Sequence, residues 1–160
     1  MKRVLFLCTG NYYRSRFAEI FFNWHAQQRG IGWRAASRGL MLVKENVGPL
    51  SCHTIARLAA LGIPFDEHQR LPQAVCYEDF EAAEHIVAVK RAEHHPLLEA
   101  QFPEWLERVE FWDIHDVDCA EASEAIPALE RHVLALLARF AGPPPETRHI
   151  KTIQGEAPMQ

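Results

Sequence analysis

The sequence lacks the features that would mark a membrane protein, a zinc protein or a nucleic-acid-binding protein. No apolar run approaches the roughly 18 residues that a membrane span requires. The four cysteines show no paired spacing for zinc, and the nine histidines include no His-Glu-x-x-His pattern. The net charge of −4 gives no general attraction to nucleic acid or to an anionic membrane. We therefore expect a soluble protein without a metal, in which any affinity for anions is local.

A secretory signal pattern is also lacking, because Met1-Lys2-Arg3 leads directly into a short apolar run. The cysteines are expected to be free thiols in a reducing compartment, since disulfides are uncommon there. We therefore expect a cytoplasmic protein. A chain of 160 residues can bury roughly two thirds of its unfolded surface, enough for one domain with its own core.

Strand and helix patterns alternate along the chain. The periodicity predicts strands over 3–8, 33–38, 84–89 and 108–112, and helices over 15–29, 50–62, 92–101 and 119–140. Right-handed crossovers between such strands place helices on both faces of a parallel sheet. The last helix carries an apolar stripe, which we expect to cover one sheet face: Ile126, Leu129, Val133, Leu136, Leu137 and Phe140. We expect residues 141–160 to form a flexible tail without a catalytic role.

One segment combines a thiol and a guanidinium at the spacing of a phosphate cradle. Five residues separate Cys8 from Arg14 in Cys-Thr-Gly-Asn-Tyr-Tyr-Arg-Ser at 8–15, between an apolar run and a helical pattern. A loop at such a corner presents the unpaired N–H groups of the first helical turn, where the helix dipole is positive. We interpret it as an anion-binding loop with a nucleophile. The structural alternative is a buried, inert cysteine beside an arginine.

The residue types of this loop suit phosphoryl transfer. A thiolate is favoured beside an arginine and at a helix N-terminus, so Cys8 is the candidate nucleophile. Arg14 offers a planar fork of donors that matches two phosphoryl oxygens and stabilises the charge of the transition state. Ser15 either donates its hydroxyl proton to the Cys8 sulfur or only caps the helix. The other candidate substrate-binding residues are Thr9, Gly10, Asn11, Tyr12 and Tyr13.

Two pairs within this set have distinct expected roles. Gly10 can take a positive φ or allow a close backbone approach, and Asn11 tolerates the left-handed region and bonds neighbouring backbone. Tyr12 and Tyr13 either narrow the mouth of the site, where they would meet an aromatic substrate, or pack into the core. Tyr12 is the preferred rim residue.

Several segments, in the same order, resemble one known family. They are Val-Leu-Phe-Leu-Cys-Thr-Gly-Asn-Tyr-Tyr-Arg-Ser at 4–15, Ala-Ser-Arg-Gly at 36–39 and the acidic-then-apolar stretch at 83–89. They resemble low-molecular-weight protein tyrosine phosphatases over residues 3 to about 140. The resemblance implies a three-layer α/β fold over 1–140, a four-stranded parallel sheet with the first strand central (phosphotyrosine phosphatase I fold). It also implies a hydrolase that forms a cysteinyl-phosphate intermediate and needs neither a metal nor another cofactor.

The same resemblance places a general acid at Asp116, in the stretch 109–117. Hydrolysis of a phosphate ester requires such a group whatever the family, because an acid must protonate the departing oxygen and its carboxylate can then activate water. The residues alone leave Asp113, Asp116 and Asp118 open, and we rank Asp116 first. An acidic loop that only caps the next helix is the better interpretation for Asp118 and Glu121.

Two departures from the family pattern concern the loop and the acid segment. Tyr13 stands where the family often has a second cysteine, so the nucleophile has no disulfide partner within the loop. Arg16 replaces the usual proline, and we expect Arg16, Arg34 and Arg38 to add to the local positive field. The family's Asp-Pro and paired aromatic residues are replaced at 116–119. The substrate is therefore left open between phosphotyrosine in a protein and a small aryl phosphate.

Two competing functions are possible on such a loop. Arsenate reduction needs a relay of two further thiols, and Cys76 has no partner a few residues downstream, the next cysteine being Cys119. A regulatory module would bind a phosphoryl group with weak turnover. The expected partners are a phosphorylated protein or a small aryl phosphate, and inorganic phosphate or another oxyanion in the loop; neither nucleic acid nor membrane is expected.

Overall fold

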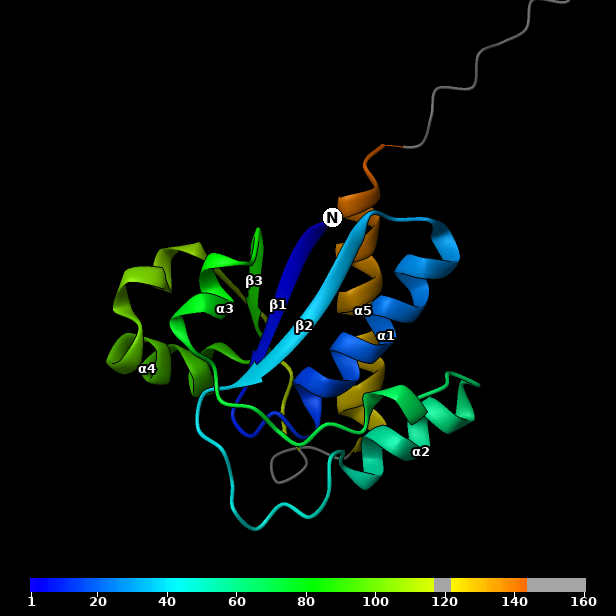
Figure 1. The fold of residues 1–160 in the computed structure, drawn as a ribbon, viewed down its shortest axis with the longest axis horizontal. Coiled ribbons are helices and arrows are strands. Elements are labelled where there is room, and N and C mark those ends of the chain that lie inside the picture. The colour runs from blue at the N-terminus through cyan, green and yellow to red at the C-terminus, as the bar shows by residue number, and fades with distance from the viewer. Residues whose placement is uncertain (117–121, 144–160) are drawn as a thin grey trace, which may run out of the picture.

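The chain alternates strands and helices as the sequence predicts (Figure 1). A computed structural model describes residues 1–116 and 122–143, and for residues 122 and 123 it describes the backbone alone. The elements, where η denotes a 3₁₀ helix, are β1 (Lys2–Cys8), α1 (Arg14–Arg29), β2 (Trp33–Gly39), α2 (Cys52–Ala60), η1 (Asp66–His68), α3 (Tyr77–Glu81), β3 (His85–Ala88), α4 (Arg91–Gln101), η2 (Pro103–Arg108), β4 (Val109–Phe111) and α5 (Ala122–Ala141).

The four strands form a parallel sheet in the order β2-β1-β3-β4. Strand β1 lies inside the sheet, with Leu5 opposite Ala36 on β2 and Ile86 on β3. The loop after β1 therefore lies between the loops that follow β2 and β3. The carboxyl edge of a parallel sheet is where α/β proteins bind ligands, and the predicted fold, with its central first strand, is confirmed.

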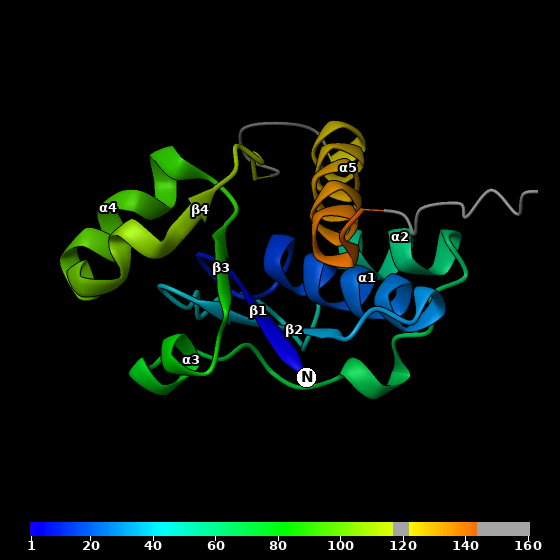
Figure 2. The same ribbon diagram turned by 90° about the horizontal axis from the view of Figure 1, so that it is seen from above.

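Apolar clusters cover both faces of the sheet, and Figure 2 shows α1 and α5 on one side of the strands and α3 and α4 on the other. Successive side chains of a strand point to opposite faces. Val4 and Phe6 accordingly join the cluster under α1 and α5, whereas Leu5 and Leu7 join the cluster under α3 and α4. Burial on both faces explains why β1 reads as a continuous apolar run rather than an alternating one.

Helix α5 confirms the predicted apolar stripe. Five of its six residues are buried in the first cluster, and Phe140 packs against that cluster with its ring stacked 3.7 Å from the ring of Trp33. The helix therefore covers the sheet face together with α1 (Figure 1). Within the described part of the chain, no helix is long and apolar enough to cross a bilayer.

The structure adds three short helical segments, η1, α3 and η2, that the periodicity did not predict. Each has six residues or fewer, too few for a helical period to show. Helix α2 is also shorter than predicted. It begins at Cys52 because Ser51 Oγ accepts the N–H of His53 at 3.2 Å, and it ends before Gly62, whose φ is 70°. The expected tail from residue 144 onward lies outside the described residues.

Candidate active site

Cys8 ends β1 with its sulfur in contact with the start of α1. The side chain is 2% exposed, and its Sγ lies 2.8 Å from Ser15 Oγ. The amide of Asn11 donates to the same Ser15 oxygen at 2.9 Å. A hydroxyl carries one proton, so with its oxygen already accepting from Asn11, Ser15 can direct that proton at the sulfur. Ser15 does not cap the helix, as the alternative interpretation proposed, because the N-cap residue of α1 is Tyr13.

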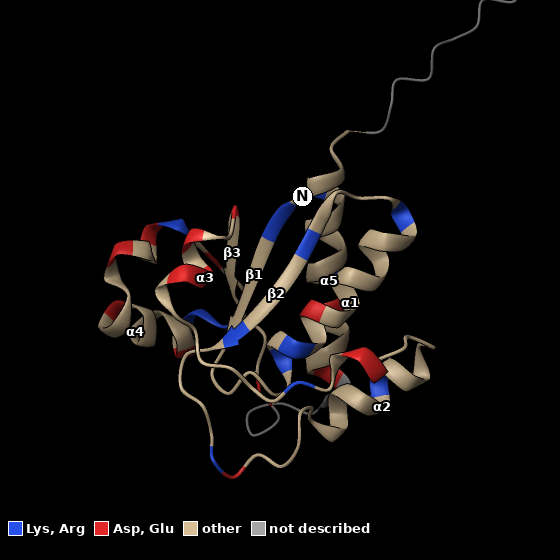
Figure 3. Ribbon diagram, viewed as in Figure 1, with Lys and Arg blue, Asp and Glu red and all other residues tan. Residues whose placement is uncertain are grey.

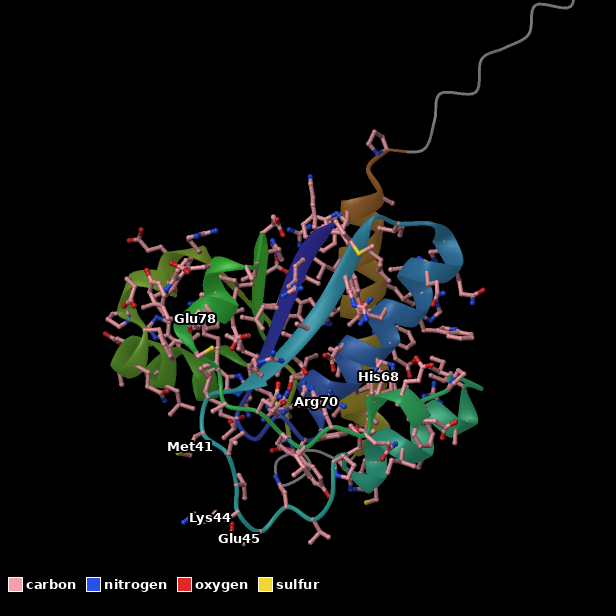
Figure 4. All side chains as sticks on the ribbon, viewed as in Figure 1. Met41, Lys44, Glu45, His68, Arg70 and Glu78 are labelled. Carbon is pink, nitrogen blue, oxygen red and sulfur yellow. The ribbon has the colours of Figure 1, made fainter. Side chains whose placement is uncertain are left out.

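Asn11 forms the buried base of the loop. It is fully buried and takes a φ of 51°, so the left-handed conformation falls on Asn11 and not on Gly10. Its Nδ2 donates to Ser37 Oγ at 2.9 Å, and its Oδ1 accepts from Arg70 Nη1 at 2.9 Å and from the N–H of Gln73 at 3.1 Å. In Figure 4, Arg70 lies beside the start of α1, whereas Lys44 and Glu45 project from the tip of the loop between β2 and α2.

Arg14 is buried to 2% exposure and its guanidinium is held on several sides. Nη1 and Nη2 donate to the two carboxylate oxygens of Glu93 at 2.9 and 2.8 Å. Nη1 also donates to the Ile114 carbonyl at 3.0 Å. Burial opposes the charge on Arg14, but its hydrogen bonds to Glu93 and the nearby acidic groups outweigh this effect, and the pKa of Arg14 is raised above its usual value. Arg14 is therefore a permanent cation of fixed orientation.

Of the described acid candidates, Asp116 is the one at the loop. Its Oδ2 lies 3.4 Å from Arg14 Nη2, and 37% of its side chain is exposed. Asp113 is exposed and lines a separate pocket with Phe111 and His132. Asp118 lies outside the described residues. A partly exposed carboxylate beside Arg14 is placed where it could protonate a leaving group at the mouth of the pocket.

A pocket of about 500 Å³ opens above these groups. Its lining residues are Cys8, Thr9, Gly10, Tyr12, Tyr13, Arg14, Val43, Asn46, Ser51, Cys52, His53, Glu93 and Asp116. Cys8, Arg14 and Asp116 are thus brought together, with four of the six predicted substrate-binding residues. The other two, Asn11 and Ser15, are fully buried and do not line the pocket.

The two loop tyrosines are placed differently. Tyr12 is partly exposed and donates its hydroxyl to the Val47 carbonyl at 2.7 Å, which fits the expected rim position. Tyr13 is 7% exposed, packs its ring against that of His53 and belongs to the core cluster. Its hydroxyl makes no hydrogen bond within the described residues. Burial and the neighbouring Asp116 raise the pKa of Tyr13 to about 12.

The additional arginines do not line the pocket. Arg16 is 1% exposed and pairs with Glu19 at 2.6 Å, and Arg38 pairs with Asp79 at 3.2 Å. Basic residues do gather around the start of α1 and the end of β2 (Figure 3), but among the pocket-lining residues the arginine is Arg14. None of Arg16, Arg34 and Arg38 lines the pocket, and their expected contribution to the local positive field stays a prediction.

Several functional neighbours were missed by the sequence analysis. Glu93 and His53 line the pocket, and Arg70 supports the loop from behind. Glu93 lies in the first turn of a helix that follows a predicted strand, so its closeness to the loop after the central strand could have been expected from the topology. The contact of Arg70 had no comparable signal, because it comes from an irregular segment.

A family model described as low molecular weight phosphotyrosine protein phosphatase matches residues 3–139. Sequence comparison with curated proteins gave no match. Among solved structures, YfkJ from Bacillus subtilis is 24% identical, with 88% of this chain and 95% of that chain covered and a TM-score of 0.76. A low molecular weight protein tyrosine phosphatase from T. tengcongensis is 25% identical, with 86% and 95% covered and a TM-score of 0.69.

The fold is also shared with the YwlE arginine phosphatase, in a mutant that carries a phosphorylated active-site serine. That protein is 19% identical, with 88% of this chain and 96% of that chain covered and a TM-score of 0.73. The family match spans most of the chain, and the structural matches agree with it in fold. The chain therefore belongs to the low molecular weight phosphotyrosine protein phosphatase family, and is a phosphatase of the cysteine-dependent type that needs no metal.

Proposed function

We propose that the protein hydrolyses phosphotyrosine in proteins, or a related aryl phosphate, through a phosphoryl group carried on Cys8. The observation that carries the proposal is the Cys8 sulfur, held 2.8 Å from the Ser15 hydroxyl in a loop whose Arg14 lies at the same pocket. A hydroxyl donor stabilises a thiolate both as the resting nucleophile and as the later leaving group.

In the first step, the Cys8 sulfur attacks phosphorus and the bond from phosphorus to the substrate oxygen breaks. Asp116 gives its proton to that oxygen, which leaves as an alcohol or phenol. Arg14 and the backbone N–H groups of the loop bind the equatorial oxygens, on which charge is spread in the transition state. Asp116 Oδ2 lies 3.4 Å from Arg14 Nη2, and this position at the same pocket supports the arrangement.

In the second step, the Asp116 carboxylate takes a proton from water, and the water oxygen attacks phosphorus. The bond between sulfur and phosphorus breaks, which returns a thiolate that Ser15 stabilises. Inorganic phosphate and the reprotonated Asp116 are the products. One carboxyl group therefore serves both steps.

The depth of the pocket supports an aryl phosphate. Cys8 is 2% exposed, so among phosphorylated protein side chains a long one brings its phosphoryl group to the sulfur more readily than a short one. The partly exposed ring of Tyr12 and the neighbouring His53 give the pocket aromatic walls, against which a phenyl ring can pack. We expect a phosphotyrosine peptide to be hydrolysed faster than the matched phosphoserine peptide.

The test is to trap the phosphoryl group on Cys8. With p-nitrophenyl phosphate, an acid quench followed by mass spectrometry should locate the adduct on Cys8, and Cys8→Ser should lose turnover. Asp116→Asn should slow turnover by about 10²- to 10⁴-fold, most of all for substrates with poor leaving groups. The exposed Asp113→Asn is the matched control and should retain activity. Turnover that persists in Cys8→Ser would refute the proposal.

Arsenate reduction is less well supported. The Cys76 thiol does not line the pocket, and it donates to Asp79 Oδ2 at 3.2 Å. This hydrogen bond raises the pKa of Cys76, which makes it a poorer attacking thiol. Cys119, the next thiol along the chain, lies outside the described residues. We expect no arsenate-dependent oxidation of thioredoxin or glutaredoxin by this protein.

A further inference from the structure

Glu93 is the charged group most closely engaged with Arg14. It is the third residue of α4, and 29% of its side chain is exposed at the pocket. Both carboxylate oxygens accept from Arg14, in the end-on geometry that a guanidinium and a carboxylate favour. Burial alone would raise the pKa of Glu93, but hydrogen bonds from His94, Arg14 and Thr9 lower it well below its usual range. Glu93 is therefore an anion at every pH of interest.

A chain of directed hydrogen bonds holds this carboxylate. The backbone N–H of Lys90 donates to His94 Nδ1 at 3.1 Å, which leaves the ring proton on Nε2. That nitrogen lies 3.1 Å from Thr9 Oγ1, and Thr9 in turn donates its hydroxyl proton to Glu93 Oε1. His94 is fully buried, and burial lowers its pKa, which favours the neutral ring. The hydrogen bonds therefore run from His94 Nε2 to Thr9 and from Thr9 to Glu93.

The pattern decides which edge of Arg14 remains for a ligand. Its four terminal N–H groups point to the two oxygens of Glu93, to the Ile114 carbonyl and, at 3.4 Å, to Asp116. The Nε–H makes no hydrogen bond within the described residues. The edge formed by Nε and Nη2 is therefore the one that a phosphoryl group can share, once it replaces the long contact to Asp116.

We infer that Glu93, held by Thr9 and His94, is a positioning residue that turns the Nε edge of Arg14 toward the phosphoryl group. This inference rests on the proposed function of the loop. A carboxylate so near the anion site could instead compete with phosphate for Arg14. The two roles predict opposite effects of neutralising Glu93, because positioning requires its charge, whereas competition would be relieved by its loss.

Binding of inorganic phosphate to the Cys8→Ser protein, followed by calorimetry, separates these roles without depending on turnover. In that background we expect Glu93→Gln to weaken phosphate binding by about 10- to 100-fold, the effect of losing one charge-assisted hydrogen-bond pair. Glu99→Gln makes the same change on an exposed part of the same helix and should bind within about twofold of the parent. Unchanged or tighter binding in Glu93→Gln would overturn the inference.

A purely structural role for Glu93 is distinguished by the same titration. Partial misfolding would lower the fraction of binding-competent protein and leave the dissociation constant unchanged. Should Glu93→Gln fail to fold, Thr9→Val keeps the carboxylate but removes the hydroxyl that orients it, and should weaken phosphate binding by about 3- to 10-fold. A Thr9→Val protein with the parent's affinity would also overturn the inference.

With Cys8 restored, Glu93→Gln should lower kcat for p-nitrophenyl phosphate more than it raises KM, since the Arg14 contact strengthens in the transition state. A wild-type protein that binds phosphate but forms no adduct on Cys8 would refute the proposed hydrolysis. The calorimetric comparison of Glu93→Gln would still decide the positioning role.

Discussion

Replacing Asn11 should show that the loop is held by a buried amide and not by its ligand. All four hydrogen-bonding sites of that side chain are used: two donated bonds, to Ser15 and Ser37, and two accepted bonds, from Arg70 and Gln73. The side chain is fully buried, so water cannot replace these partners in Asn11→Ala. The change therefore removes one hydrogen bond each from the Arg70 guanidinium, two serine hydroxyls and the backbone N–H of Gln73.

The magnitude follows from the bonds lost and from the backbone. Four bonds at about 0.5–1.5 kcal/mol each amount to roughly 2–6 kcal/mol. Position 11 has a φ of 51°, and this left-handed conformation costs an ordinary residue such as alanine about 1–2 kcal/mol more. Glycine has no Cβ and does not carry this cost. Together these two terms predict that Asn11→Ala loses about 3–8 kcal/mol of unfolding free energy. Asn11→Gly should be about 1 kcal/mol less destabilised than Asn11→Ala.

Urea unfolding followed by tryptophan fluorescence measures both variants, with an unchanged m-value as the check that the unfolded state is comparable. Asn46→Ala, at the pocket rim, is the matched control and should change the free energy of unfolding by no more than about 0.5 kcal/mol. A loss below about 1 kcal/mol in Asn11→Ala, or a glycine variant less stable than the alanine one, would refute the reasoning.

Two further predictions concern buried polar groups beside the pocket. Tyr13→Phe removes a buried hydroxyl that has no hydrogen-bond partner within the described residues, so the free energy of unfolding should stay within about 1 kcal/mol of the parent or rise. A loss of unfolding free energy above about 2 kcal/mol, measured by thermal or urea unfolding, would show that the hydroxyl makes a hydrogen bond after all. The pKa of His94 is lowered by burial and by Arg14, so the unfolded state takes up protons first as pH falls. The contribution of neutral His94 to the free energy of unfolding should therefore be complete above about pH 6.5 and decrease toward pH 5. Urea midpoints that do not change across this range would contradict the prediction.

The loop itself could be predicted from the sequence because its determinants are local. A buried strand, the Cys8 and Arg14 spacing and a following helix lie within one short segment, and each has its own pattern. Asn11 was correctly expected to tolerate a left-handed conformation, although the alternative of a positive φ at Gly10 was wrong. The structure shows instead that Gly10 approaches the loop after β2, where an added Cβ would lie 3.2 Å from Asn46 Nδ2.

The partners of the loop leave no local signal in the sequence, because they are distant from it along the chain. Glu93 is 79 residues from Arg14, and Arg70 is 59 residues from Asn11. Neither contact leaves a periodic signal. The sequence shows only that the histidines lack a metal-ligand spacing, whereas in the structure His94 fixes the direction of a hydrogen bond to Thr9. This role can be assigned only when the hydrogen-bond partners of both ring nitrogens are known, and these come from the structure.

The strand order explains why these distant residues meet at one loop. Because β1 lies between β2 and β3, the segments that follow those two strands flank the loop on either side. From the β2 side, Ser37 and Arg70 bind the buried amide of Asn11, and from the β3 side, Glu93 binds the guanidinium of Arg14. The loop is thus fixed at its base and at its arginine by two independent sets of contacts. A sequence change within the loop, such as Tyr13 in place of a cysteine, leaves both sets intact, so the anion-binding geometry can persist while the wall of the pocket varies.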